Sequence, residues 1–546
     1  MRAEAILVWL LLFAAHAALL WTSGAFQAEF GEYPDEPAHY VTGLMVRDYL
    51  AAGASSPPMA FAGNYYLHYP KVALGHYPPL FCIVETVWML AFSSSRASLL
   101  VLVAVLTAIA ATVLHFVVRE RYGSLAGVMA GLLLIATPLV QRYCGMVMPE
   151  ALCMLFIVSA ALCYCRYLET KRWPDAAWFG LLASLALLTK QVALFLALVP
   201  LIAVILTRQF GLLRRPSFWL PACIVLAIAA PWYGYAHSLL PGRILDYAGQ
   251  VLGHLSLGDQ VLQLLRWVGL GLLLPMAAGV WTHVIRPILR AQPVQPAWAV
   301  WAALIVAFLL SRPVMPAAYE SRHLIYLLPA ILFFAVDGIA SLAAKLPPAR
   351  WKPGKRAALL ALAAGLAFGV ETFKIPQRRY IGFSEAAEDL VASAELRTSV
   401  LLVCSDSQGE GAFIAAVAAR EKRPGHLVLR GSKMLARTTW SGDVYALRYK
   451  TVDELAAYLQ SVPVDVLVVE VSGGQPQMEH RKLVQSMLDS GADRWKLNGT
   501  YPKKRSSSPP GAEVRVYCRT GGGLLPAGKI HIKVRHPLGD VSSSEP

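Results

Sequence analysis

The chain has 546 residues, of which 56% are apolar and only 15% are charged. Soluble domains carry about a quarter charged residues, so this composition argues against a soluble globular protein. The formal net charge of +15 fits nucleic-acid binding, an anionic membrane surface or a topology signal, and the positions of the charges decide among them.

Long apolar blocks dominate the chain up to residue 374. A helix needs about 20 apolar residues to cross the hydrocarbon core of a membrane. Because many apolar blocks follow the first one, at 6–20, we predict an uncleaved first span there rather than a cleaved signal peptide. The other predicted spans are 97–118, 123–143, 151–168, 176–189, 192–207, 218–237, 264–285, 297–310, 324–343 and 357–373. This gives about eleven transmembrane helices, with a break at Lys190, since one continuous helix would carry that charge through the bilayer centre.

One apolar stretch, residues 78–92, is left out of the count. It contains Glu85 and is too short to span, so we interpret it as an interfacial or re-entrant helix. The predicted inner segments then hold 16 Lys and Arg against four Asp and Glu, while the outer segments up to Lys374 hold ten against about eleven. The positive-inside rule places the N-terminus in the cytoplasm and the C-terminal region outside. The basic excess is therefore an orientation signal, and it gives no support to nucleic-acid binding.

After Lys374 the apolar runs become short and β-branched. This pattern predicts a membrane-embedded domain over 1–374, a small extracytoplasmic α/β domain over 375–520 and a flexible tail over 521–546. Two interpretations stay open for Cys404 and Cys518, a disulfide or free thiols. The predicted strands are 399–404, 426–429, 464–471 and 513–518, and the predicted helices are 411–420, 452–460 and 480–488.

Polar side chains gather in the first predicted outer loop, where Asp35 and Glu36 are adjacent. Neighbouring carboxylates at a membrane surface suit a general base, since one can ionise while the other orients it. The alternative is a solvated acidic turn in which Asp35 is the N-cap of a helix. The residues that follow in the same loop are Tyr65, Tyr66, His68, Lys71, His76 and Tyr77.

Three more charged residues, Glu150, Lys190 and Arg322, fall on the same predicted side of the membrane. A carboxylate at a helix N-terminus is common for electrostatic reasons, and cations near a bilayer surface often reach lipid headgroups. Carboxylates and cations gathered at one boundary also suit a reaction in which a lipid phosphate leaves while an acceptor loses a proton.

The order of these motifs resembles the dolichyl-phosphate-mannose protein mannosyltransferase family, a wide group that includes the lipid A aminoarabinose transferases. The resemblance covers roughly residues 1–375 and has a Glu and an Arg-His where the family has an Asp and an Arg-Tyr. The matching motifs are Asp35-Glu36, His76-Tyr77-Pro78-Pro79-Leu80, Arg96, Arg121-Tyr122-Gly123, Thr137-Pro138, Met148-Pro149-Glu150, Leu188-Thr189-Lys190 and Arg322-His323-Leu324-Ile325-Tyr326.

This resemblance implies a GT-C glycosyltransferase in a bacterial inner membrane. Such an enzyme moves a sugar from a polyprenyl-phosphate donor to a hydroxyl of a protein, lipid or glycan at the outer face, with inversion at the anomeric carbon. It implies Asp35 as the catalytic base, Glu36 as its support and Glu150 as the second acid. In the mechanism that we expect, Lys71, Lys190 and Arg322 bind the donor phosphate, and Tyr65, Tyr66, His68, His76 and Tyr77 bind the substrates. The alternative for the tyrosines is that they anchor the loop at the membrane interface, which is the more common use of Tyr there.

No obligatory cofactor is expected, although a divalent metal is compatible with Asp35, Glu36, Glu150 and a nearby His, which have no ligand spacing that demands one. The alternative function is a transporter or flippase for a lipid-linked or anionic substrate. Transporters place charged sites near the bilayer midplane, whereas the acids and bases here concentrate at one surface. This difference favours the enzyme.

Overall fold

The structure, a computed structural model, divides into two compact units built from non-consecutive segments. Unit 1 comprises residues 1–25, 75–81 and 100–375, and unit 2 comprises 26–74, 82–99 and 376–546. The predicted span 357–373 and most of the predicted tail lie outside the described residues. Those described are 2–239, 257–315, 320–345, 382–397, 399–421, 425–438, 445–472, 478–490, 494–503, 511–520, 531–533 and 540–542.

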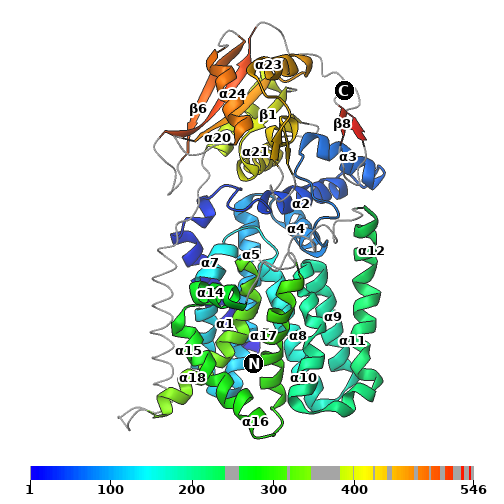
Figure 1. Cartoon of the computed structure of the whole chain (residues 1–546), viewed down its shortest axis with the longest axis vertical. Helices are drawn as coiled ribbons and strands as arrows, with labels where there is room; N and C mark the ends of the chain where they lie inside the picture. Colours follow the sequence, from blue (N-terminus) through cyan, green and yellow to red (C-terminus); the bar gives the residue numbers. More distant parts are fainter. Residues whose placement is uncertain are drawn as a thin grey trace. The chain divides into compact units, whose positions relative to one another are not determined.

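Unit 1 is built of helices, many of them running alongside one another (Figure 1). They are α1 (Arg2–Thr22), α5 (Arg96–Tyr122), whose first turn belongs to unit 2, α6 (Ser124–Ala136), α7 (Pro138–Tyr143), α8 (Glu150–Thr170), α9 (Trp173–Thr189), α10 (Val199–Thr207), α11 (Pro216–Ile228), α12 (Ala230–Leu239), α14 (Leu257–Val268), α15 (Leu270–Val280), α16 (Arg286–Leu289), α17 (Pro296–Ser311) and α18 (Leu328–Lys345).

Within the described residues, six helical stretches are long and apolar enough to cross a membrane. Four shorter apolar helices accompany them, at Leu80–Ala91, Ser124–Ala136, Gln191–Thr207 and Pro296–Ser311. These helices confirm the prediction of a mostly helical protein with several membrane spans. The six long stretches are Arg2–Thr22, Arg96–Tyr122, Glu150–Thr170, Pro216–Ser238, Leu270–Leu289 and Ser321–Ser341.

Small residues bring α15 and α18 into close contact. A Cβ atom added at Gly338 of α18 would lie 2.0 Å from the carbonyl oxygen of Pro275 in α15, and one at Gly279 would lie 2.4 Å from that of Phe334. Glycine at such positions lets helix backbones approach, which is how many membrane helices associate. By contrast, a Cβ atom at Gly271, also on α15, would meet nothing within 4 Å.

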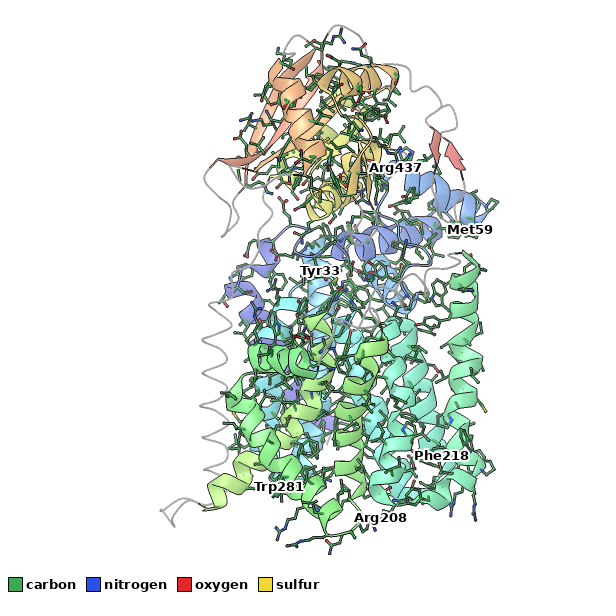
Figure 2. All side chains as sticks on the ribbon, in the orientation of Figure 1. Tyr33, Met59, Arg208, Phe218, Trp281 and Arg437 are labelled. Carbon is green, nitrogen blue, oxygen red and sulfur yellow. The ribbon has the colours of Figure 1, made fainter. Side chains whose placement is uncertain are left out.

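The chain breaks its helix at Lys190, as predicted. Helix α9 ends at Thr189, Lys190 is extended with φ −156° and ψ 128°, and a 3-10 segment, η2 (Gln191–Ala197), leads toward α10. Because of this break, the charge of Lys190 does not lie in the middle of one long continuous apolar helix. Helix α10 ends at Thr207, and the residue that follows, Arg208, lies at one end of the helical unit (Figure 2).

Unit 2 contains a five-stranded sheet in the order β2-β1-β5-β7-β6. Strands β2, β1 and β5 are parallel, and β7 pairs antiparallel with both β5 and β6. All five residues of β1 are buried, as in a sheet covered on both faces. The strands are β1 (Val400–Cys404), β2 (Leu427–Arg430), β5 (Val466–Ser472), β6 (Trp495–Pro502) and β7 (Ala512–Arg519), with two small pairs, β3 (Ala436–Thr438) with β4 (Tyr445–Leu447) and β8 (His531–Lys533) with β9 (Asp540–Ser542).

Side-chain caps fix the starts of two helices beside this sheet. Asp406 accepts hydrogen bonds from the backbone N–H groups of Gln408 and Gly409, and Thr451 forms a capping box with Glu454. The helices of unit 2 are α2 (Glu36–Ala51), α3 (Pro58–His68), α4 (Leu80–Ala91), which begins in unit 1, α20 (Phe383–Ala392), α21 (Ser407–Arg420), α22 (Gly431–Met434), α23 (Val452–Ser461) and α24 (Glu479–Ser490).

The predicted strands and helices of this region are present, with limits shifted by a few residues. Strand β6 was not predicted, because it contains Lys496, Asn498 and Gly499, which are poor strand formers. Cys404 and Cys518 are free thiols, so the disulfide interpretation is wrong. Strand β5 lies between the strands that carry them, which keeps the two thiols apart.

Candidate active site

The candidate residues fall into two groups, one in each unit, and each group has its own geometry. Unit 2 holds Asp35, Glu36, Tyr65, Tyr66, His68 and Lys71. Unit 1 holds His76, Tyr77, Glu150, Lys190 and Arg322.

Asp35 stands at the N-cap of α2. Its side chain makes no capping hydrogen bond to that helix. Pro37 lies in the first turn, where its missing N–H costs nothing. The side chain is 9% exposed, and the positive end of the helix dipole favours its ionised form.

Glu36 is fully buried and held by Arg96. Arg96 approaches the same Glu36 oxygen with Nε at 2.9 Å and Nη2 at 2.8 Å, and its Nη1 donates to the carbonyl of Ala28 at 2.8 Å. A buried carboxylate needs such a partner, because an unpaired charge in the interior is very costly. Glu36 thus anchors the first turn of α2, directly beside Asp35.

Glu85 of α4 is a second buried acid in this region. Neither of its carboxyl oxygens has a hydrogen-bond partner among the described residues. A Cβ atom at Gly43 of α2 would lie 3.1 Å from Glu85 Oε2, so the carboxyl faces that helix. Burial and, to a smaller degree, the Glu36 charge raise the pKa of Glu85 well above its ordinary value.

Lys71 lies between the Asp35 turn and the C-terminal part of unit 2. Its Nζ donates to the carbonyl of Pro34 at 3.2 Å, and its side chain is 4% exposed. A Cβ atom at Gly411 of α21 would lie 2.7 Å from Lys71 Cε. Burial first, and then the Arg430 charge, lower the pKa of Lys71 to about 7, against the opposing attraction of Asp35.

Further charges near Lys71 come from α21 and the end of β2. Glu410 accepts hydrogen bonds from Arg430 Nε at 2.8 Å and from the backbone N–H and hydroxyl of Ser432 at 2.7 and 2.6 Å. Burial and Arg430 lower the pKa of Lys433 to about 8. Sequence reasoning missed Glu410, Arg430 and Lys433, because no motif surrounds them and only the fold brings them near the loop.

The aromatic residues of the loop also contact the C-terminal segment. Tyr69 donates a hydrogen bond to Glu421, and His68 Nδ1 lies 3.1 Å from the carbonyl oxygen of His426. Tyr65 donates to Asp48 at 2.9 Å.

The hydroxyl of Tyr66 is buried, which raises its pKa, while the Arg430 charge opposes that shift. Tyr65, Tyr66, His68 and Lys71 therefore belong to one packed assembly of loop and sheet.

In unit 1, Glu150 brings two of the predicted cations together. It is fully buried at the first position of α8, and Lys190 Nζ donates to its Oε1. Arg322 Nε lies 3.8 Å from the same oxygen and 2.7 Å from Glu320 Oε2. Arg322 belongs to a 3-10 segment, η7 (Ser321–Leu327).

His76 and Tyr77 are half-buried in the segment before α4 and are assigned to unit 1. In the described part of the chain, no group of three or more His, Cys, Asp or Glu residues has an arrangement that could hold a metal ion. Oε1 of Glu36 is already engaged by Arg96.

Residues 76–235 match the family model of dolichyl-phosphate-mannose-protein mannosyltransferases. No curated protein sequence matches the chain.

Several solved structures resemble the whole chain. ArnT from Cupriavidus metallidurans, bound to undecaprenyl phosphate, superposes with a TM-score of 0.57 at 15% identity, covering 95% of this chain and 99% of that one. The oligosaccharyltransferase AglB from Archaeoglobus fulgidus, with an inhibitory peptide and a dolichol-phosphate, gives 0.52 at 12% identity, covering 92% and 75%. The arabinofuranosyltransferase AftD from Mycobacteria gives 0.51 at 14% identity, covering 95% and 40%.

Proposed function

We propose that this chain, which has the fold of the GT-C glycosyltransferases, moves a sugar from a polyprenyl-phosphate donor to a hydroxyl group of a protein, lipid or glycan. The observation that carries the proposal is the similarity along nearly the full chain to transferases whose structures contain a polyprenyl phosphate. Among the residues that the structure describes, no feature favours a transporter or flippase over a glycosyltransferase.

In the proposed reaction, Asp35 accepts the proton of the acceptor hydroxyl while that oxygen attacks the anomeric carbon. The bond from the anomeric carbon to the phosphate oxygen breaks, and the polyprenyl phosphate leaves with the electron pair. Attack from the face opposite the leaving group inverts the anomeric centre. The placement of Asp35 in the turn that also holds Lys71, whose Nζ donates to the carbonyl of Pro34, supports a site that combines a base with a cation.

Glu36 is a positioning residue in this proposal, since Arg96 holds its carboxylate and the first turn of α2 is fixed with it. Glu150 is assigned the second acid role. Its contact with Lys190 supports a site that gathers charge, because a buried carboxylate orients the cation that binds it.

Lys71, Lys190 and Arg322 are proposed to neutralise the departing phosphate. Lys190 and Arg322 converge on Glu150, which supports their acting together. The buried position of Lys71 makes its charge sensitive to its surroundings, so an approaching phosphate would favour its protonated form.

Tyr65, Tyr66, His68, His76 and Tyr77 are proposed to line the path of the sugar and the acceptor. No step is assigned to a metal ion, because Glu36 already pairs with Arg96 and the candidate acids do not form a ligand set among the described residues. We further propose eleven spans, with the N-terminus in the cytoplasm of a bacterium and the C-terminal part of unit 2 outside the inner membrane.

The experiment compares Asp35→Asn with Glu32→Gln. The second variant is the control, because Glu32 lies in the same loop and has no role in the proposed reaction. Purified variants are given radiolabelled polyprenyl-phosphate sugars and a membrane extract that contains the acceptors. Loss of a general base is expected to slow transfer by about 10²–10⁴-fold in Asp35→Asn, with Glu32→Gln near the wild-type rate. A folded Asp35→Asn protein with full activity would remove the proposed base.

A further inference from the structure

Unit 2 contains a cavity of about 420 Å³ between the end of α2, helix α3 and the segment before β2. This volume falls in the range of about 300–1,000 Å³ that is typical of small-molecule sites. Helices α2 and α3 lie side by side (Figure 1), and α3 also contacts β2. The lining residues therefore place the cavity where the loop meets the sheet. The side chains that line it include Asp48, Phe61, Asn64, Tyr65, His68 and Tyr69.

One wall of the cavity is an aromatic strip. Phe61, Tyr65 and Tyr69 follow one another at intervals of four residues, so they lie on one helical face. Their ring centroids are 5.9 Å and 5.0 Å apart along the strip. Both tyrosines are fixed by hydrogen bonds to Asp48 and Glu421, which makes the wall rigid. Aromatic faces carry partial negative charge and attract the weakly positive C–H face of a sugar ring.

Besides the two tyrosine hydroxyls, the side chains on the cavity wall contribute a carboxylate, an amide and an imidazole. Asn64 is exposed, and its amide both donates and accepts hydrogen bonds. His68 Nδ1 lies against the carbonyl of His426, so in the neutral ring Nδ1 carries the proton and Nε2 is an acceptor. Flat polar groups beside a flat apolar wall match a ring that has hydroxyls at its edge and C–H bonds on its face.

The charge of the lining argues against other ligands. Asp48 Oδ1 is paired with Arg47 Nε at 2.7 Å, and none of the described residues that line the cavity is Lys or Arg, so the lining offers no cation to hold a phosphate or another anion. An alkyl chain would displace water from the Asn64 amide and offer it no hydrogen bond, which is costly. A neutral saccharide needs no cation in the lining, and its hydroxyls can form hydrogen bonds with the polar side chains.

The cavity is distant from the candidate base. Asp48 follows Asp35 by 13 positions on the same helix, and a rise of 1.5 Å per residue separates them by about 20 Å. A sugar in the cavity therefore cannot be the one that reacts at Asp35. It would belong to a part of the acceptor several sugar units away.

We propose that this cavity binds a sugar unit of an extended, neutral glycan acceptor, remote from the hydroxyl that is glycosylated. This inference rests on the proposed function and narrows its acceptor class to an oligosaccharide-bearing molecule.

The test measures binding without catalysis, by saturation-transfer NMR on the full chain in lipid nanodiscs, because maltoside detergents themselves carry sugar. The probes are the tetrasaccharides of maltose, cellulose, chitin and α-1,6-mannan. At least one is expected to bind, and Phe61→Ala and Asn64→Ala should each weaken it by about tenfold. Met59→Ala, a change at an exposed position of the same helix (Figure 2), should leave binding unchanged.

Absence of binding for all four tetrasaccharides at millimolar concentration would overturn the proposal, as would equal binding in wild type and Phe61→Ala. Either result would leave the role of Asp35 standing if Asp35→Asn still abolishes transfer. Conversely, saccharide binding in a protein whose transfer activity does not need Asp35 would retain the cavity and remove the proposed base.

Discussion

Replacing Arg96 with Met tests whether Glu36 is held as a buried charge. Arg96 places two nitrogens at 2.9 and 2.8 Å from one Glu36 oxygen, and its Nη1 donates a hydrogen bond to the carbonyl of Ala28. The Arg96 side chain is 8% exposed and that of Glu36 is fully buried. Methionine keeps much of the length and apolar volume of arginine but removes the charge and all three contacts.

The expected cost follows from this geometry. Two unit charges about 4 Å apart attract by about 4 kcal/mol at an effective dielectric constant of about 20. Removing one partner of a buried ion pair costs roughly 3–5 kcal/mol. We therefore expect Arg96→Met to lower the free energy of unfolding by about 4 kcal/mol. The double variant Glu36→Leu/Arg96→Met should lose about 1 kcal/mol or less, because it leaves no charge buried.

The assay is equilibrium unfolding in mixed micelles, followed by circular dichroism. Arg515→Met is the matched control, since its pair with Glu513 is 34% and 21% exposed and should contribute about 0–1 kcal/mol. The reasoning fails if Arg96→Met is no less stable than Arg515→Met. It also fails if the double variant is as unstable as Arg96→Met alone.

A methyl group at Gly338 must push the facing backbone of α15 from 2.0 Å to the ordinary 3.4 Å, so Gly338→Ala should cost about 3 kcal/mol of stability and Gly271→Ala almost none. Equal unfolding midpoints would contradict the close packing. Because burial lowers the pKa of Lys71 to about 7, the unfolded chain binds that proton more tightly. Wild-type stability should therefore rise relative to Lys71→Met by about 1 kcal/mol per pH unit between about pH 7 and 10, whereas parallel pH profiles would show that the amine is not desolvated. For topology, Lys482→Cys in a background with Cys82, Cys163, Cys223 and Cys518 each replaced by Ser should react with an impermeant thiol reagent outside intact cells, and labelling only after lysis would reverse the orientation.

Much of the helical unit could be predicted from composition and charge alone. The break at Lys190 followed from the cost of a charge at the bilayer centre, and the structure places that residue in extended conformation. The sequence also suggested that Glu150, Lys190 and Arg322 share one side of the membrane. Their convergence on one carboxylate oxygen needed the structure, because hydropathy does not report which helices are neighbours.

The surroundings of Asp35 were less predictable. The pairing of Glu36 with Arg96 and the packing of Lys71 against Gly411 depend on contacts between distant parts of the sequence. No periodic pattern in the sequence links the first loop to α21. The sequence around Gly411 also gives no sign that this glycine makes room for Lys71. Arg430 ends an apolar strand, where a basic residue ordinarily faces solvent, so the sequence carried no sign of its proximity to Lys71.

The assembly of unit 2 from distant segments has a consequence for biosynthesis. Tyr69 and Glu421 are separated by 352 positions, and His68 and His426 by 358. At about 5–20 residues per second, a ribosome needs roughly 20–70 s to make the chain between them. Throughout that interval the nascent α2 and α3 have left the ribosome without the surface they pack on. The newborn loop is therefore a substrate for chaperones and proteases, and a chain that terminates before residue 400 leaves the same aromatic surface uncovered permanently.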